Sequence, residues 1–361
     1  MIVFPDIGIC NWKALQIRDH DINIIIGSTS LVLMISDLER PIAVWKGNER
    51  LNDRLVVSLT IIFRSAGCSW SRCRMCSYRH ERYSTKQSEE SLVNHLHAQL
   101  AYVLSQYPED TYELVKIFTS GSFFDPSEVP PAFVTEIAET FRGKVIIAET
   151  RPEFVNEEVF RDFIGIADTG KKDIPLYCAI GLETSNDAIL SKSIDKGFRF
   201  RDFTEAARTA HAAGAGVKAY LLFKPLFLTE KEAMDDMRTS IRDAADHAEL
   251  ISMNPCTVQR NTQLERYWKR GAYRPPYLWS ILELLKDAPV HILCDPLGGG
   301  QKRGPHNCGT CDFDLVRGIR DYSLNADREL LEALLETECG CKNEWDFILS
   351  EERPYAMPLT R

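Results

Sequence analysis

"SLTIIFRSAGCSWSRCRMCSY", residues 58 to 78, joins an apolar, β-branched run to a loop that holds three cysteines. The run up to residue 63 predicts a buried strand. Cys68, Cys73 and Cys76 follow directly, so their loop lies at the carboxyl end of that strand, where a barrel of parallel strands builds its chemistry. Three thiolates can hold three irons of a 4Fe-4S cluster and leave the fourth iron open. The alternative is a structural zinc site that a distant residue completes.

Five further apolar runs with strand character follow along the chain. They lie at residues 113 to 119, 144 to 149, 177 to 183, 216 to 223 and 250 to 255, with helical patterns between them. Near-continuous apolar strands covered by helices predict a parallel sheet. Six such units predict an α/β fold, a partial (β/α)6 barrel of the TIM type, with a flat doubly wound sheet as the alternative.

Composition limits the classes of protein to consider. The chain has 361 residues, of which 44% are hydrophobic, so it can bury a large core without disulfides. Its eleven cysteines, several in short-spaced groups, favour metal binding in a reducing cytoplasm. We expect a cytoplasmic protein without a signal peptide or membrane span. The net charge of -9 means that any RNA contact uses a local basic patch or a partner subunit.

Changes in composition near both ends predict three parts. We expect an N-terminal extension at residues 1 to 54, a barrel at residues 55 to 288 and a small cysteine-rich extension at residues 289 to 361. The last part is Gly-rich, and we expect a metal to staple it. Met34 is an alternative start of translation.

The second group of cysteines lies in the C-terminal part. CxxC spacing lets the sulfurs of Cys308 and Cys311 reach one ion, and zinc takes four such ligands in a tetrahedron. We predict zinc bound by Cys294, Cys308, Cys311 and Cys341, with the fourth ligand open because Cys339 and His306 lie near in the sequence. An auxiliary iron-sulfur cluster or free thiols are the alternatives.

Basic residues gather in three stretches of this acidic chain. Residues 258 to 279 interleave cations with aromatic side chains: Arg260, Arg266, Lys269, Arg270 and Arg274 with Tyr267, Trp268, Tyr273 and Trp279. Arg72, Arg74, Arg79 and Arg82 lie in or just after the cysteine loop, and Lys302 and Arg303 in the Gly-rich tail. Cations can hold phosphates while aromatic faces stack bases, which favours a local RNA contact. A solvated helix face with its aromatics in the core is the alternative.

"RSAGCSWSRCRMCSY", with "RPIAVWKGNERL" before it and "RGPHNCGTCD" far downstream, resembles the archaeosine-synthase radical SAM family, which is related to the radical domain of the elongator acetyltransferase. The resemblance covers roughly residues 40 to 350. The usual superfamily spacing is CxxxCxxC, whereas here four residues separate Cys68 from Cys73. The resemblance implies that Cys68, Cys73 and Cys76 hold a 4Fe-4S cluster whose open iron binds S-adenosylmethionine (SAM).

The resemblance also implies SAM contacts at the ends of successive strands. Met75 holds the position of an aromatic residue that usually touches the adenine. The remaining implied contacts are Ser120, Gly121 and Ser122 with the methionine amino group, Glu149 and Arg151 with charged groups, and Glu183 and Lys224 at the mouth. An ordinary turn, a plain ion pair or rim charges would explain the same residues. No catalytic residue is implied.

The function that the resemblance implies is a step of tRNA modification. A partner transferase attaches lysine to a 7-cyano-7-deazaguanine-derived base in the tRNA D-loop. A deoxyadenosyl radical then abstracts hydrogen, and the lysine carbon-nitrogen bond is cleaved to leave the formamidine of archaeosine. The implied partners are tRNA, the lysine-transferase subunit of archaeosine synthase and an electron donor. Another radical SAM enzyme acting on RNA or a small molecule, and a non-catalytic zinc-stapled RNA-binding adaptor, are the alternatives.

Overall fold

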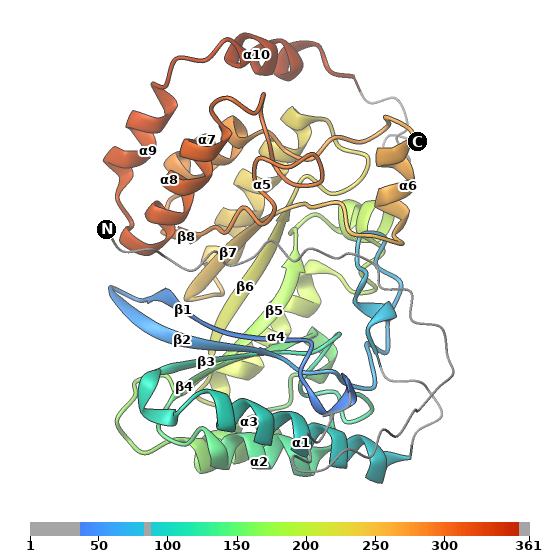
Figure 1. Ribbon diagram of the computed structural model, residues 1–361, viewed down its shortest axis with the longest axis vertical. Coiled ribbons are helices and arrows are strands. Elements are labelled where there is room, and N and C mark those ends of the chain that lie inside the picture. The colour runs from blue at the N-terminus through green and yellow to red at the C-terminus, as the bar shows by residue number, and fades with distance from the viewer. Residues whose placement is uncertain (1–36, 83–87, 354–361) are drawn as a thin grey trace, which may run out of the picture. The chain divides into compact units, whose positions relative to one another are not determined.

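The computed structural model describes residues 37–82 and 88–353, and one eight-stranded sheet lies at its centre (Figure 1). The strands are β1 (Ala43–Leu51), β2 (Arg54–Ile62), β3 (Leu114–Phe118), β4 (Val145–Thr150), β5 (Leu176–Glu183), β6 (Gly216–Phe223), β7 (Leu250–Pro255) and β8 (Ile292–Leu293). They lie in sequence order; β1 and β2 pair antiparallel, and all later neighbours pair parallel. Within the described residues β1 and β8 do not pair with each other, so the sheet curls into an open half barrel.

Helices cover the outer face of the sheet (Figure 1). They are α1 (Glu89–Gln106), α2 (Pro131–Thr140), α3 (Glu157–Ala167), α4 (Phe200–Ala212), α5 (Glu230–Ala245), α6 (Gln263–Lys269), α7 (Leu278–Asp287), α8 (Asp312–Asn325), α9 (Arg328–Leu335) and α10 (Cys341–Glu351). Short 3-10 turns η1 (Asp37–Glu39), η2 (Tyr78–His80), η3 (Glu109–Thr111) and η4 (Pro152–Phe154), and a π-helical turn η5 (Ile189–Ile194), lie between them. Helices α1, α2 and α3 lie side by side near β2 to β4, and α7, α8 and α9 lie at the β8 end.

The six strands expected from the sequence are β2 to β7, and the partial-barrel prediction is confirmed over the flat doubly wound alternative. The near-continuous apolar runs arise because both faces of these strands are buried. In β5, seven of eight residues are buried and only Glu183, at the carboxyl end, is half-buried. Strands β1 and β8 were not expected; they extend the sheet at its two edges.

Side chains fill the interior of the half barrel near the amino ends of the parallel strands. The Glu49 carboxylate lies 2.5 Å from Lys116 Nζ and 3.3 Å from Lys218 Nζ. Although burial raises the pKa of Glu49, Lys218 and Lys116 lower it to about 2, so the carboxylate stays charged between them. Buried Leu114, Ile147 and other apolar side chains pack in the same inner layer. The interior of the half barrel is therefore open at the carboxyl ends of the parallel strands.

The predicted domain boundaries, 1–54, 55–288 and 289–361, stay predictions. The sheet and the core continue across both of them: β1 pairs with β2 on one side, and β8 pairs with β7 on the other. Buried Trp345 of α10 belongs to the same hydrophobic core as Leu59 of β2. Met34 and all of residues 1–36 lie outside the described residues.

Candidate active site

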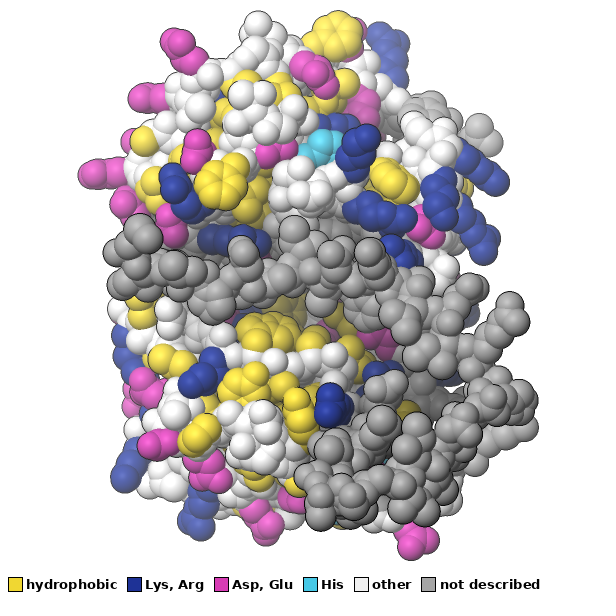
Figure 2. Space-filling view, in the orientation of Figure 1, with side chains coloured by type: hydrophobic (Ala, Val, Ile, Leu, Met, Phe, Trp, Pro, Cys, Tyr) yellow, Lys and Arg dark blue, Asp and Glu magenta, His cyan; other side chains and the backbone are white. Residues whose placement is uncertain are grey.

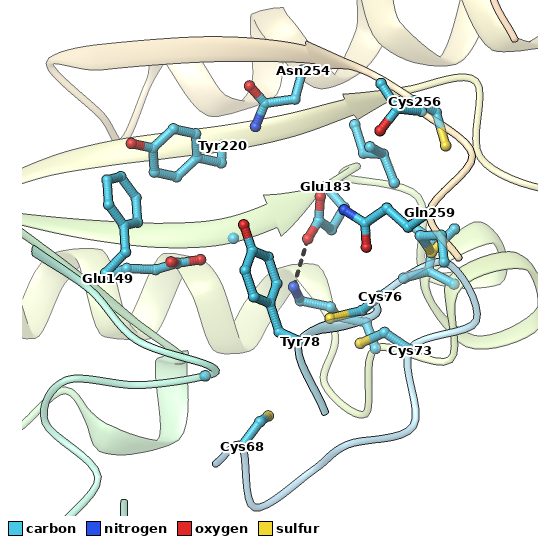
Figure 3. A pocket seen from close by; sticks show the side chains of 18 of the residues that line it. Cys68, Cys73, Cys76, Tyr78, Glu149, Glu183, Tyr220, Asn254, Cys256 and Gln259 are labelled. Carbon is cyan, nitrogen blue, oxygen red and sulfur yellow. Dashed lines mark hydrogen bonds and ion pairs between the residues drawn. The ribbon is translucent and has the colours of Figure 1, made fainter. Parts of the chain in front are cut away.

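A pocket of about 360 Å³ opens at the carboxyl ends of the parallel strands (Figure 3). Its wall includes Cys68, Cys73 and Cys76 from the loop after β2, so the structure brings the three thiols of the sequence motif to one cavity. Figure 3 shows Cys73 and Cys76 side by side and Cys68 across from them. The volume lies within the range of small-molecule and cofactor sites.

The cysteine loop is fixed by contacts to the last residue of η5 and the segment that follows it. The Arg74 N–H donates to the Ile194 carbonyl at 2.9 Å, and the Trp70 Nε1–H donates to the Asp195 carbonyl at 2.6 Å. A Cβ added to Gly197, whose φ is +84°, would lie 2.4 Å from the Trp70 ring, so only glycine permits this approach. The loop is therefore held in place before any ligand binds.

Gly121 lets the cysteine loop pack closely against the turn after β3. A Cβ at this position would lie 2.6 Å from Cys68 Cβ and 2.8 Å from Cys68 Sγ. The Gly121 and Ser122 N–H groups donate to the buried Glu128 carboxylate at 2.9 and 2.7 Å, which fixes the turn after β3. The Ser120 hydroxyl is buried at the pocket and has no hydrogen-bond partner within the described residues. An unsatisfied hydroxyl beside a thiol cluster fits a site that a cofactor completes.

Three thiols at one pocket are the donors that an iron-sulfur cluster takes. Burial raises the pKa of Cys76 to about 12 and also raises the pKa of Cys73. The thiols of Cys73 and Cys76 therefore carry their protons when nothing is bound, and a metal must displace those protons to bind the thiolates. Cys178 is buried outside the pocket, as small core residues are. Cys256 is also buried, but it lines the pocket (Figure 3).

Two acidic and two basic residues line the same pocket. Glu183 ends β5, and its carboxylate lies 2.6 Å from Lys196 Nζ (Figure 3). Burial raises the pKa of Glu149 to about 8, although Lys196 lowers it. The Arg151 side chain is 7% exposed and bonds Glu153 and the Lys196 carbonyl at 2.6 and 3.0 Å, so its guanidinium already has protein partners.

The structure differs from the expected set of cofactor contacts at two positions. Lys224 follows β6 but does not line the pocket: its Nζ lies 2.7 Å from Glu230 Oε2, and both side chains are buried. Ser122 is also absent from the wall, because its hydroxyl accepts the Arg151 N–H at 3.0 Å. Met75, Ser120, Gly121, Glu149, Arg151 and Glu183 all line the pocket.

Sequence reasoning missed several residues of the wall. Lys196 belongs to a loop outside the strands, and Tyr78 comes from the turn after the cysteines. Tyr220, Asn254 and Gln259 come from β6, β7 and the segment after β7 (Figure 3). Tyr220 and Asn254 could have been found by following strand alternation to the inner face of the barrel. Lys196 has no such signal.

The second cysteine group assembles with a different fourth member from the one expected. The ligand atoms of Cys308, Cys311, Cys339 and Cys341 all lie within 4.8 Å of one another. Cys294 is not in this group: it follows β8, and its side chain is buried in the main hydrophobic core. The expected ligand Cys294 is thus replaced by Cys339, which lies just before α10.

The three basic stretches meet beside the pocket. The Gln263 N–H donates to the Arg74 carbonyl at 3.0 Å, and the Val258 N–H donates to the Arg303 carbonyl at 2.7 Å. Figure 2 shows Lys and Arg side chains gathered on this part of the surface, where Figure 1 places α6. We define the basic rim by its exposed cations: Arg72, Arg82, Arg260, Arg266, Lys269, Arg270 and Lys302. Arg274 is not part of it, because its guanidinium bonds the His306 carbonyl at 2.7 Å.

Two of the four interleaved aromatic residues are buried in the core. Trp279 is fully buried, and Tyr273 is buried with its hydroxyl bonded to the Lys224 carbonyl at 2.8 Å. Tyr267 and Trp268 are half-buried, and the Arg303 guanidinium lies 4.6 Å above the Trp268 ring. Base stacking by Tyr273 and Trp279 is therefore excluded, whereas the cations of the rim face solvent.

The structure places a three-cysteine loop after the first parallel strand of an open β/α barrel, at the edge of a charged pocket, as the resemblance stated from the sequence implies. No family model matches the chain. Archaeosine synthase subunit beta of Methanosarcina acetivorans is 40% identical over 90% of this chain and 94% of its own length. The protein of the same name from Thermococcus kodakarensis is 37% identical over 84% and 95%. The chain belongs to the archaeosine synthase subunit beta family, so the resemblance stated from the sequence is confirmed.

Solved structures match at lower similarity. Methylornithine synthase has a TM-score of 0.47 and 13% identity, covering 73% of this chain and 69% of that chain. Queuine lyase from Clostridium spiroforme, bound to SAM and queuine, has a TM-score of 0.44 and 15% identity over 69% and 94%. Among the described residues no helix has the length and apolar character needed to cross a membrane.

Proposed function

We propose that this protein is the radical SAM lyase of archaeosine formation. It cleaves the lysine carbon-nitrogen bond of a lysine-modified 7-deazaguanine base in the tRNA D-loop, so that the lysine side-chain nitrogen stays on the base as part of the formamidine of archaeosine. The observation that carries the proposal is the thiol triad of Cys68, Cys73 and Cys76 at the edge of a charged pocket, in a member of the archaeosine synthase subunit beta family. The protein acts in the cytoplasm.

The residues of the pocket divide into those for the cluster and those for SAM. Cys68, Cys73 and Cys76 hold a 4Fe-4S cluster, and the missing side chain of Gly121 lets Cys68 approach the turn after β3. Met75, Ser120, Glu149, Arg151, Glu183 and Lys196 are the proposed SAM contacts. When bound, the cluster and SAM supply a deoxyadenosyl radical, which can take hydrogen from a carbon that ordinary acids and bases do not activate.

The protein's own side chains bind and orient. Glu183 and Lys196 present one carboxylate and one ammonium at the wall, which matches a ligand that carries both charges. The Ser120 hydroxyl gains a partner when a polar ligand fills the pocket. Glu149, whose pKa is about 8 without a ligand, releases its proton when a cation binds beside it. Apolar Phe118 and Leu222 help to exclude water from the same space.

The basic rim is the proposed contact for tRNA. Its exposed cations come from three stretches that hydrogen bonds hold together beside the pocket, and the overall charge of -9 makes this concentration of cations distinctive. Lys and Arg side chains bind phosphates and steer RNA to one opening. A lysine-transferase subunit supplies the lysine-bearing tRNA and part of the affinity for it, and an external donor supplies electrons.

The test is conversion of the modified base. Anaerobically reconstituted protein, SAM and a reductant are incubated with tRNA that carries the lysine-modified base, and the nucleosides are separated by mass spectrometry. We expect the formamidine nucleoside to appear with the wild type and with Cys178→Ala, which changes a buried cysteine outside the pocket. We expect none with Cys73→Ala. Recovery of unchanged tRNA from active, SAM-cleaving protein would favour another radical SAM reaction, and an iron-free protein that binds tRNA would favour an adaptor.

A further inference from the structure

The four cysteines of the C-terminal part have the geometry of a site for one ion. The sulfur atoms are separated by 4.0 Å for Cys308 and Cys311, 3.6 Å for Cys308 and Cys339, 3.7 Å for Cys311 and Cys341, and 3.3 Å for Cys339 and Cys341. Four sulfurs at 2.3 Å from one tetrahedral zinc ion lie about 3.8 Å apart. The observed separations bracket this value.

These short separations argue against an auxiliary iron-sulfur cluster. In a cluster the thiolates bind different irons, which spreads the sulfurs further apart than ligands of a single ion. Here all four sulfur atoms lie within 4.8 Å of one another. Among divalent ions, zinc binds such a ligand set more tightly than Fe²⁺.

N–H groups of two neighbouring side chains point at the cysteine sulfur atoms. The Trp279 Nε1–H points at Cys341 Sγ at 3.3 Å, and the Asn307 Nδ2–H points at Cys311 Sγ at 3.5 Å. Four thiolates on one divalent ion leave a net negative charge, and N–H groups aimed at sulfur stabilise it. Both donors come from residues outside the four cysteines, and Trp279 belongs to α7.

The site lies between the Gly-rich loop and the last helix. Cys308 and Cys311 precede α8, whereas Cys339 lies just before α10 and Cys341 is its first residue. Upstream of Cys308, Leu297 lines the pocket, and Arg303 bonds Val258 in both directions: its carbonyl accepts at 2.7 Å and its Nη1 donates at 2.8 Å. An ion that joins the two pairs of cysteines therefore anchors a loop that borders both the pocket and the basic rim.

We propose that Cys308, Cys311, Cys339 and Cys341 bind one structural zinc ion, which fixes the Gly-rich loop at residues 295 to 306. The site is separate from the thiols of the pocket and does not depend on the reaction that the pocket catalyses. Zinc is closed in by four protein ligands, so it takes no part in the chemistry. The ion stabilises the Gly-rich loop in place of side-chain packing, which a loop rich in glycine lacks.

The test separates the two metal sites in the full-length protein. In a Cys68→Ala/Cys73→Ala/Cys76→Ala background, metal analysis should find one zinc per chain and no iron, and X-ray absorption should give zinc-sulfur distances of about 2.3 Å. Cys341→Ser should lose the zinc, whereas Cys294→Ser, which changes a cysteine outside the group, should keep it. Iron or no metal at this site, or a zinc content that Cys341→Ser and Cys308→Ser leave unchanged, would overturn the proposal.

The anchoring role has its own measurement. Lys302 and Arg303 are sites for trypsin within the loop. We expect chelator-treated wild-type protein and Cys341→Ser to be cut there several-fold faster than zinc-loaded protein, while circular dichroism shows that the helices remain. Equal cleavage rates with and without zinc would show that the ion does not hold the loop.

Discussion

Gly121 shows how one residue can decide whether the cysteine loop accepts a cluster. The position where its Cβ would lie is already within 2.8 Å of Cys68 Cα, which is backbone and cannot swing aside. Gly121→Ala therefore forces the loop and the turn after β3 apart. Iron retained after reconstitution and desalting should fall several-fold, because cluster binding depends on where the thiolates are held.

Gly165 offers the matched control for this substitution. It lies within α3, and a Cβ there would meet nothing within 4 Å. Gly165→Ala should keep the wild-type iron content and stabilise the protein by about 0.5–1 kcal/mol, since alanine is the better helix former. Equal iron retention by both variants would contradict the steric account of Gly121.

Glu149 makes stability depend on pH. Its native pKa of about 8 is raised above the ordinary 4.5, so its stabilising contribution is complete below about pH 4.5 and is lost as the pH rises through 8. Without SAM, wild-type protein should lose about 2 kcal/mol relative to Glu149→Gln between about pH 6 and about pH 8. Urea unfolding across this range measures the difference. Glu139→Gln, an exposed change in α2, should follow the wild type, and a pH-independent gap for Glu149→Gln would refute the assignment.

At the scale of elements, the sequence predicted the strands that are buried on both faces. Helices cover one face of these strands, and side chains inside the barrel cover the other. Strands β2 to β7 are recognisable because burial on both faces requires apolar residues throughout, as in β5. Strand β1 mixes exposed Lys46 with a buried Leu51 at one edge of the sheet, and β8 has only two residues. Edge strands of this kind carry little periodic signal.

A residue's position after a strand in the sequence predicts its place in the fold, but it does not predict the direction of its side chain. Lys224 directly follows β6, as expected, yet its φ of +59° turns the chain, and its ammonium pairs with Glu230 of α5. Choosing Cys294 rather than Cys339 as the fourth ligand was wrong for a similar reason: the thiols of Cys339 and Cys341 meet those of Cys308 and Cys311 only in the folded chain. Such pairings depend on tertiary contacts that spacing does not encode.

The Lys224–Glu230 pair joins β6, α5 and α7. Glu230 also accepts the Ser280 hydroxyl at 2.6 Å and the Tyr277 N–H at 2.8 Å, and it is fully buried. Lys224→Met leaves this carboxylate without its cation, so we expect a loss of about 3–5 kcal/mol in unfolding free energy. SAM affinity measured well below the unfolding transition should not change. A stable Lys224→Met variant that has lost SAM binding would restore Lys224 as a cofactor contact.

Lys231→Met is the control for the buried pair. Lys231 pairs with Asp235 on the surface of α5, where the two side chains are 63% and 52% exposed. An exposed pair one helical turn apart contributes only about 0.3–0.5 kcal/mol. The two lysine variants should therefore differ in stability by several kcal/mol in chemical denaturation.

For the whole molecule, charge is distributed unevenly. The net charge is -9, yet the basic rim gathers exposed cations on one side of the pocket. Arg266→Gln/Arg270→Gln should weaken tRNA binding and reduce the slope of log K against log salt by about 0.7–0.9 for every phosphate that the variant no longer neutralises. Arg142→Gln/Lys171→Gln removes two exposed cations that precede β4 and β5, at the opposite end of the barrel, and should leave the slope unchanged. If both double variants behaved alike, tRNA would not bind at the rim.

The central claim joins radical chemistry to one modified tRNA, and deoxyadenosine formation tests that link most directly. Reconstituted protein, SAM and reductant are incubated with tRNA that carries the lysine-modified base or with unmodified tRNA. We predict that deoxyadenosine rises only with the lysine-bearing tRNA and matches the amount of base converted, and that Cys73→Ala abolishes it. Equal SAM cleavage with both tRNAs would contradict the substrate assignment, and no cleavage by protein verified to hold its cluster would contradict the enzyme assignment itself.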